Sequence, residues 1–200
     1  MTTPDIILWD VMGTLVHDPF YEEVPAFFGM TLEELLKVKH PSVWSACERG
    51  EVSVEDMETR FFADSRAYDI GGLRQTMARS YRWLPGIEAL LSTLQARGVP
   101  MHVVSNYTPW YAMIEATLSL SKWMPWSFVS CDVGLRKPDA AYYAAVLERL
   151  WVPAGRCVFI DDRQANCAGA AAAGMPSILF EDGVTTATAL SALGFGNLVD

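Results

Sequence analysis

The sequence has no excess of basic residues and no long apolar run. Its 200 residues include 15 lysines and arginines against 24 aspartates and glutamates, giving a formal net charge of -9. A nucleic-acid partner needs a basic face that neutralises phosphates, so this charge argues against one. An uninterrupted run of about 18 apolar residues, which a membrane span requires, is also missing. We therefore expect a globular protein that binds neither nucleic acid nor a membrane.

Cysteine and histidine are few and scattered. The four cysteines, Cys47, Cys131, Cys157 and Cys167, form no CxxC pair, which favours reduced thiols in a cytoplasmic protein. The three histidines are isolated from one another, so no zinc site is expected. Neither a basic segment nor a cleavable apolar segment precedes the first apolar run, which also favours the cytoplasm. The sequence carries no indication of oligomeric state.

From about residue 84 onward, the chain alternates apolar strands with amphipathic helices. Helices are expected from Pro85, from Pro138 and over residues 166–173, and strands over residues 6–9, 101–104, 157–160 and 177–180. This alternation predicts an α/β fold, a Rossmann-like parallel sheet with helices on both faces. Ligands of such sheets bind beyond the carboxyl ends of the strands.

Residues 16–83 do not follow this alternation. Residues 31–34 and 53–56 resemble capping boxes that begin helices, and the stretch contains no convincing strand. We interpret residues 16–83 as a helical cap domain inserted into a catalytic core formed by residues 1–15 and 84–200. An insertion that leaves the sheet just after Asp10 would lie over any site at that edge.

The first strand leads directly into an aspartate. The apolar run over residues 6–9 ends at Asp10, and Gly13 allows close backbone approach in the turn that follows. A carboxylate at the end of a buried strand suggests a covalent nucleophile. The position two residues later, where a second carboxylate could act as general acid and base, is Met12.

Polar residues follow the other expected strands as well. Ser105 and Asn106 follow the second strand, Lys137 precedes a helix, and Asp161 and Asp162 follow the strand over residues 157–160. Each has an ordinary explanation as a helix cap, a solvated charge or a turn residue. Because the carboxyl ends of parallel strands meet at one edge, the set together predicts one site.

These segments resemble a known family. Residues 10–14, 105–106, 137–139 and 161–162 with Asn166 are similar to the four motifs of the haloacid-dehalogenase-like hydrolase superfamily. The resemblance covers essentially the whole chain, including a helical cap between the first two motifs. It implies that Asp10 attacks phosphorus to form an aspartyl-phosphate, that Lys137 neutralises charge, and that Ser105 holds transferring oxygens. The implied substrate-binding residues are Met12, Gly13 and Asn106.

The resemblance also implies a Mg²⁺ ion. Asp162, supported by Asp161, would hold it together with Asp10 and the backbone carbonyl of Met12. A phosphate approaching a carboxylate at about 4 Å meets repulsion of about 4 kcal/mol per charge pair at an effective dielectric constant near 20. Lys137 and a divalent cation would offset that repulsion. Magnesium prefers a few carboxylates plus oxygens from substrate and water, which this set provides.

Met12 departs from the phosphatase pattern and leaves alternatives open. Loss of a general acid typically costs about 10²–10⁴-fold in rate, and either His17 or a bound water is a candidate replacement. The 2-haloacid dehalogenases also lack this acid, but they use no metal and carry uncharged residues where this chain has Asp161 and Asp162. A non-catalytic phospholigand-binding protein would not need the nucleophile Asp10.

Aromatic residues in the expected cap bear on the substrate. Residues 18–30 are rich in them, and others are Trp44, Phe61, Phe62, Tyr107, Trp110 and Tyr111. They would form either the core of the cap or a flat slot for a planar ring. Residues 10–30, 39–41, 106–107 with 110–111, and 136–139 resemble plant plastid flavin mononucleotide hydrolases of this superfamily. The resemblance implies a small-molecule phosphate ester, with flavin mononucleotide as the first candidate and sugar phosphates still open.

Overall fold

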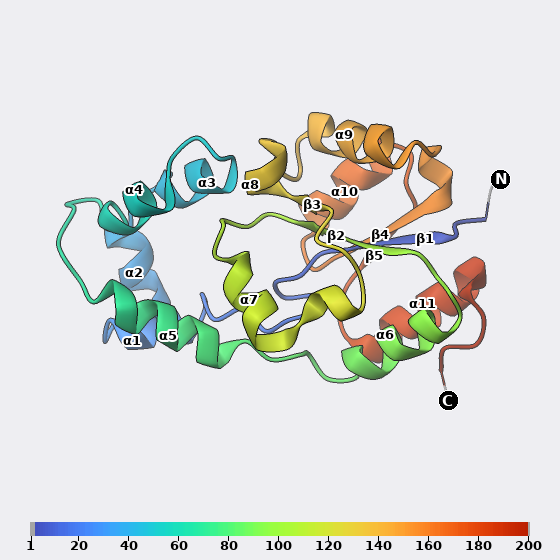
Figure 1. The fold of residues 1–200 in the computed structure, drawn as a ribbon, viewed down its shortest axis with the longest axis horizontal. Helices are drawn as coiled ribbons and strands as arrows, with labels where there is room; N and C mark the ends of the chain where they lie inside the picture. Colours follow the sequence, from blue (N-terminus) through green and yellow to red (C-terminus); the bar gives the residue numbers. More distant parts are fainter. Residues whose placement is uncertain (1–2, 200) are drawn as a thin grey trace.

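The computed structural model describes residues 3–199 and is built around one five-stranded sheet. All its pairings are parallel, in the order β3-β2-β1-β4-β5 (Figure 1). The strands are β1 (Ile6–Trp9), β2 (Met101–Ser105), β3 (Phe128–Val129), β4 (Cys157–Asp161) and β5 (Ser177–Leu179). The four strands that the sequence predicted are confirmed. The two-residue strand β3 was missed because so short an apolar stretch has no readable periodicity.

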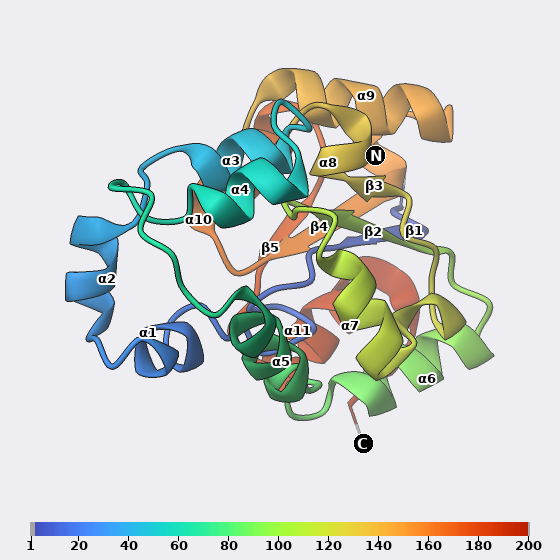
Figure 2. The same cartoon turned by 60° about the vertical axis from the view of Figure 1, so that its left-hand side comes forward.

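Helices cover both faces of the sheet, as predicted. One face carries α6 (Ile87–Ala96), α7 (Tyr111–Leu118) and α11 (Gly183–Leu190), and the other carries α9 (Ala140–Leu150) and α10 (Gln164–Ala172) (Figures 1 and 2). Alternate residues of β1 pack into different clusters, Ile7 and Trp9 towards the first group of helices and Leu8 towards the second. The fold is therefore an α/β sheet with an apolar core on each side.

Two of the flanking helices were not predicted. Helix α7 follows a loop rich in aromatic residues, and α11 has the sequence GVTTATAL, whose β-branched residues disfavour a helix. A capping box between Asp182 and Thr185 nevertheless begins α11. In the described part of the chain, residues 3–199, no helix is both long and apolar enough to cross a membrane.

Residues 16–83, all of them described, form a group of helices at one end of the sheet (Figures 1 and 2). They are α1 (Glu23–Phe27), α2 (Leu32–Val38), α3 (Val43–Glu48), α4 (Val54–Thr59) and α5 (Ile70–Ser80). The predicted capping box of α2 is present between Thr31 and Glu34. At α4 the Ser53 hydroxyl accepts from the Asp56 N–H, while its own proton goes to the Asp56 carboxylate.

The helical group is joined to the sheet by two neighbouring stretches of backbone. Val16 forms an antiparallel bridge with Trp83, and the His17 N–H donates to the Arg82 carbonyl at 2.9 Å. A further bond joins the Leu84 N–H to the Leu15 carbonyl at 2.9 Å. The chain thus leaves the sheet and returns to it at the same place, close to the end of β1. A short helix, α8 (Ser130–Val133), follows β3 on the side facing this group.

Candidate active site

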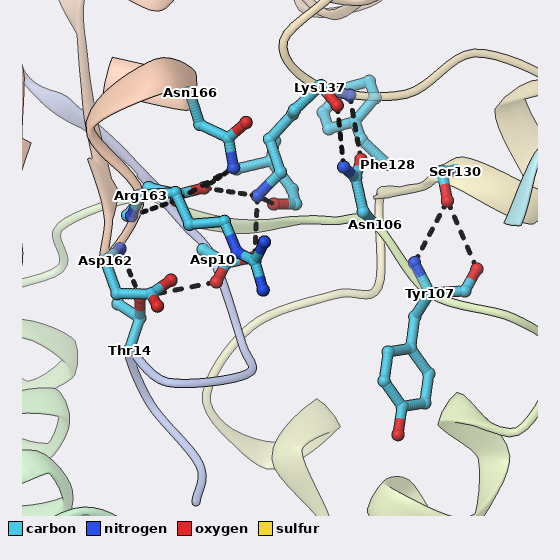
Figure 3. A network of polar contacts seen from close by, with 12 residues as sticks. Asp10, Thr14, Asn106, Tyr107, Phe128, Ser130, Lys137, Asp162, Arg163 and Asn166 are labelled. Carbon is cyan, nitrogen blue, oxygen red and sulfur yellow. Dashed lines mark hydrogen bonds and ion pairs between the residues drawn. The ribbon is translucent and has the colours of Figure 1, made fainter. Parts of the chain in front are cut away.

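The carboxyl ends of β1, β2 and β4 bring most of the predicted polar residues together (Figure 3). Asp10 directly follows β1, where its N–H donates to the Ile160 carbonyl at 2.9 Å, and Asp161 is the last residue of β4. Lys137 reaches them from the loop before α9. Residues up to 151 positions apart in sequence therefore meet at one edge, because parallel strands end side by side.

Lys137 is the centre of this arrangement. Its side chain is 1 % exposed, and its Nζ donates to Asp10 Oδ1 at 2.6 Å, to Asp161 Oδ2 at 2.6 Å and to the Val104 carbonyl at 2.7 Å. These three bonds use every proton of the ammonium group. Burial alone would lower the pKa of Lys137, but the two carboxylates raise it overall. The lysine is therefore a fixed positive charge beside Asp10.

Asn106 holds the loop that carries Lys137. Its Nδ2 donates to the Lys137 carbonyl at 2.8 Å, and its Oδ1 accepts from the Lys137 N–H at 2.8 Å. The sequence suggested contact between Asn106 and the substrate but not this backbone clamp. Ser105 is buried at the end of β2, and its hydroxyl forms no hydrogen bond within residues 3–199.

The two adjacent acids after β4 have different surroundings. Asp161 is fully buried and accepts hydrogen bonds from Lys137, from the Arg163 N–H at 2.8 Å and from Asn166 Nδ2 at 2.9 and 3.0 Å. Asp162 Oδ1 is buried without a hydrogen-bond partner in the described part of the chain. A buried acceptor without a donor costs about 1–3 kcal/mol. Of the two acids, Asp162 has the carboxylate that is free for a cation.

The site has the donor set that a divalent cation requires. Carboxylate oxygens of Asp10, Asp161 and Asp162 all lie within 4.8 Å of one another. Burial, opposed by Lys137 and assisted by the other two acids, raises the pKa of Asp10 to about 7. Burial also raises the pKa of Asp162, with Asp161 adding to the effect. The three carboxylates carry more negative charge than the single Lys137 neutralises. Their hard oxygen atoms, one of which has no hydrogen-bond partner within residues 3–199, are the kind of ligand that Mg²⁺ prefers.

Thr14 joins the first and last motifs. Its hydroxyl donates to Asp10 Oδ2 at 3.4 Å and accepts from the Asp162 N–H at 3.1 Å. The sequence placed Thr14 in the turn after Asp10 but gave it no role. Its position four residues after the nucleophile, where a short polar side chain can reach back across the turn, is the signal that could have found it.

Gly13 is required for this packing. Its φ is +79°, and a Cβ there would lie 2.8 Å from Asp162 Oδ2. Gly86 has the same φ of +79° but has nothing within 4 Å of such a Cβ. Position 13 is therefore restricted both by its backbone conformation and by the neighbouring acid, and position 86 by its conformation alone.

This pair of glycines gives a matched prediction for stability. Gly86→Ala should lower the free energy of unfolding by about 1–2 kcal/mol through left-handed strain alone. Gly13→Ala should lower the free energy of unfolding by clearly more, because the new methyl group must also displace the Asp162 carboxylate. Chemical denaturation of both variants measures the difference. Equal losses would show that the Asp162 carboxylate moves aside at no cost and does not restrict position 13.

A cavity of about 550 Å³ opens beside the nucleophile, between the sheet edge and the helical group. Asp10, Met12, Asn106 and Lys137 line it on the sheet side. Among the aromatic residues that the sequence singled out, the ones that line the cavity are Phe20, Tyr21, Trp44, Phe61 and Tyr107. Phe62 and Trp110 are instead buried in the core, and Tyr111 packs on Trp126 at 4.9 Å between ring centroids. Some of these aromatic residues therefore line the cavity and others form the core, so each of the two interpretations applies to part of the set.

Two residues near the start of the helical group differ in their relation to this cavity. His17, a candidate proton donor from the sequence, has its Nε2 2.8 Å from Glu23 Oε1 and does not line the cavity. Asp18, for which the sequence suggested no role, does line it. Arg163, also overlooked, lines the cavity and donates to the Tyr21 hydroxyl at 2.7 Å.

Comparison with known proteins gives this geometry a context. Residues 4–174 match the model of the haloacid dehalogenase-like hydrolase family. The chain is 44% identical over 189 residues to chloroplast flavin mononucleotide hydrolase 1 of Arabidopsis thaliana, covering 94% of this chain and 77% of that protein. It is 24% identical over 172 residues to a sesquiterpene phosphatase of Aspergillus oryzae, covering 82% of this chain and 85% of that one.

Solved structures share the fold. A HAD family enzyme of Bacteroides thetaiotaomicron superposes with a TM-score of 0.74 at 14% identity, covering 95% of this chain and 99% of the other. The same enzyme in complex with magnesium and inorganic phosphate gives a TM-score of 0.69 at 16% identity, covering 90% and 96%. The family match over most of the chain and the Arabidopsis relative agree with the motifs at the sheet edge. This chain is a member of the haloacid dehalogenase-like hydrolase family.

Proposed function

We propose that the protein is a Mg²⁺-dependent phosphomonoester hydrolase that works through an aspartyl-phosphate on Asp10. The observation that carries this proposal is the convergence of Asp10, Lys137 and Asp162 at the edge of the cavity. A buried lysine fixes one oxygen of the nucleophile, and a half-buried acid beside it has a buried oxygen free for a cation. A halide-displacing enzyme would have no use for that acid.

The residues divide the chemistry between them. Asp10 attacks phosphorus as the bond from phosphorus to the alcohol oxygen of the ester breaks, and Lys137 stabilises the negative charge of the nucleophile and of the phosphoryl oxygens. Ser105 and the backbone around Met12 and Gly13 are proposed to contact the transferring group. A water then attacks the same phosphorus and releases Asp10.

Asp10, Asp162 and the Met12 carbonyl are the groups that would hold the cation. When bound, Mg²⁺ supplies charge that offsets the repulsion between the phosphate and the nucleophile. Asp161 is engaged by Lys137, Asn166 and the Arg163 N–H, so its proposed role is to position Lys137. This assignment separates the two adjacent acids into a cation ligand and a support for the lysine.

Flavin mononucleotide is the proposed substrate, and residues 16–83 are proposed to act as the cap that selects it. The Arabidopsis relative bears the name of a flavin mononucleotide hydrolase. The cavity adds aromatic walls, including Phe20 and Trp44, to which a planar ring can stack. Lys39 also lines the cavity, and no carboxylate of residues 3–199 lies within ion-pair distance of it. It is available to a ring carbonyl oxygen.

A phosphate-release assay tests the proposal. With Mg²⁺, kcat/KM for flavin mononucleotide should exceed that for ribose 5-phosphate at least about tenfold, since binding energy from the ring helps to orient the phosphate. Excess chelator should abolish release from both esters. Phe20→Leu should reduce the preference for the flavin, whereas Tyr111→Leu, outside the cavity, should not.

Three outcomes would contradict the proposal in different ways. Equal kcat/KM for the two esters would remove flavin mononucleotide but keep the phosphatase. Metal-independent halide release from 2-chloropropionate would replace phosphatase by dehalogenase activity. Absence of both activities would favour a binding protein.

A further inference from the structure

The cavity contains one carboxylate that is neither used by the chemistry described so far nor held by an ion pair within residues 3–199. Three acids line it, Asp10, Asp18 and Glu48. Asp10 is the proposed nucleophile. Glu48 is engaged by Arg136 at 2.9 Å and by the Trp44 Nε1–H at 3.1 Å. Asp18 remains, and it shares the cavity with Met12, the position at which a general acid is missing.

Asp18 is held with one oxygen free. Its Oδ1 accepts from the Phe20 N–H at 3.0 Å, and Oδ2 accepts no hydrogen bond from any of residues 3–199. The backbone before it is fixed, because Val16 is bridged to both Met12 and Trp83. The residue after it, Pro19, is buried. The free oxygen is thus carried by a segment anchored next to the turn that follows the nucleophile.

Arg163 is a positive charge close to both Asp18 and the reacting centre. Its side chain lines the same cavity as Asp10 and Asp18. Burial lowers the pKa of Arg163, but Tyr21, Asp162, Asp10 and Asp18 raise it by more. One guanidinium therefore lies within electrostatic reach of the nucleophile and of the Asp18 carboxyl.

We propose that Asp18 is the general acid and base that position 12 lacks. The inference rests on the proposed phosphatase activity. As an Asp10 oxygen bonds to phosphorus, the bond from phosphorus to the leaving oxygen breaks, and the Asp18 carboxyl gives that oxygen its proton. The Asp18 carboxylate then takes a proton from the attacking water as the bond between Asp10 and phosphorus breaks. One ester and one water become one alcohol and one phosphate, and both acids are regenerated.

The surroundings of Asp18 suit this role. Burial raises the pKa of Asp18, which favours the protonated form that gives the first proton. The Phe20 N–H, Arg163 and His17 act in the opposite direction, and Glu23 adds to the rise. Two further titratable groups, the hydroxyls of Tyr81 and Tyr107, are bonded to each other at 2.9 Å and lie close enough for Asp18 to raise their pKa. Efficient proton transfer needs a pKa near the working pH, and burial moves Asp18 towards it.

The test compares esters with poor and good leaving groups. Asp18→Asn should lower kcat/KM for flavin mononucleotide and ribose 5-phosphate, both alkyl esters, by about 10²–10⁴-fold. With p-nitrophenyl phosphate, whose leaving oxygen needs no proton, kcat/KM should change less than tenfold. The variant should then release a burst of about one p-nitrophenolate per active site, because the phosphoryl-enzyme forms but lacks a base for its hydrolysis. The alkaline fall of kcat/KM for the alkyl esters should also disappear.

Two further variants separate catalysis from structure. Met12→Asp in the Asp18→Asn background should restore activity on alkyl esters at least tenfold, since it returns a carboxyl to the cavity. Glu22→Gln, an exposed carboxylate in the same segment, should leave all rates unchanged. If Asp18→Asn lost kcat/KM equally on alkyl and aryl esters without a burst, or lost none, the proposed role of Asp18 would be overturned. The proposed phosphatase activity would not be affected by that result. Absence of phosphate release by the wild-type protein from every ester would overturn the proposed function and this inference together.

Discussion

Asp10→Asn should abolish turnover, with a loss of at least about 10⁴-fold in kcat, and should leave the fold intact. An amide oxygen cannot form the acyl-phosphate that the proposed reaction requires. Removing the nucleophile of a covalent hydrolase costs factors of this order, because the remaining groups cannot replace it. Steady-state phosphate release with Mg²⁺ measures the effect.

Stability should change little in this variant. The single ammonium group of Lys137 pairs with Asp10 and Asp161, and a third carboxylate, that of Asp162, lies within 4.8 Å of these two. The raised pKa of Asp10, about 7 and caused first by burial, means that its ionised form is held at a cost in the folded protein. An uncharged amide removes that cost and can still accept a hydrogen bond from Lys137. We expect the free energy of unfolding to stay within about 1 kcal/mol of the wild-type value.

A matched control lies just before β1. Asp5 is exposed and pairs with Arg156 at 2.6 Å, so Asp5→Asn makes the same chemical change outside the site. That variant should keep full activity and lose at most about 1 kcal/mol of stability, as exposed ion pairs contribute little. Activity of Asp10→Asn within tenfold of the wild-type rate would refute the assignment of the nucleophile.

The sequence predicted the framework of the site because that framework is local. Each site residue at a strand end follows a run of apolar residues, as Asp10 and Asp161 do, and a parallel sheet necessarily brings such ends together. The same argument found four of the five strands. It failed at β3, which has two residues, and at α11, where tertiary packing and a capping box outweigh β-branched composition.

Contacts across the site could not be predicted in the same way. The clamp between Asn106 and Lys137, the bridging hydroxyl of Thr14 and the unpaired oxygen of Asp162 depend on loops folded against one another. No periodicity or spacing encodes the clamp or the unpaired oxygen, and only the position of Thr14, four residues after Asp10, indicates that its side chain can reach back across the turn. Asp18 was overlooked as well. A carboxylate in a turn followed by proline usually serves the turn itself, so the sequence does not mark it as a site residue.

Asp162→Ala should separate stability from activity. Phosphate release should fall at least about 10³-fold, because a divalent cation supplies several kcal/mol of charge stabilisation and this variant loses its free ligand. Stability in chelator should be equal to that of the wild type or about 1 kcal/mol higher, since a buried oxygen without a donor is removed. Because burial raises the pKa of Asp162, its ionised form costs stability at neutral pH, and this advantage should shrink as the pH falls.

Magnesium should reverse the order of stability of the wild-type protein and the Asp162→Ala variant. Bound to the folded state alone, it stabilises the wild-type protein by about 2.7 kcal/mol at a concentration one hundred times Kd, and the Asp162→Ala variant should gain none of this. Thermal unfolding with and without Mg²⁺ measures the reversal. Asp132→Ala, which removes an exposed acid in α8, should respond to magnesium as the wild type does. If magnesium stabilised all three proteins equally, or if the wild type kept full activity in chelator, Asp162 would not be a cation ligand and the unpaired oxygen would be only a structural cost.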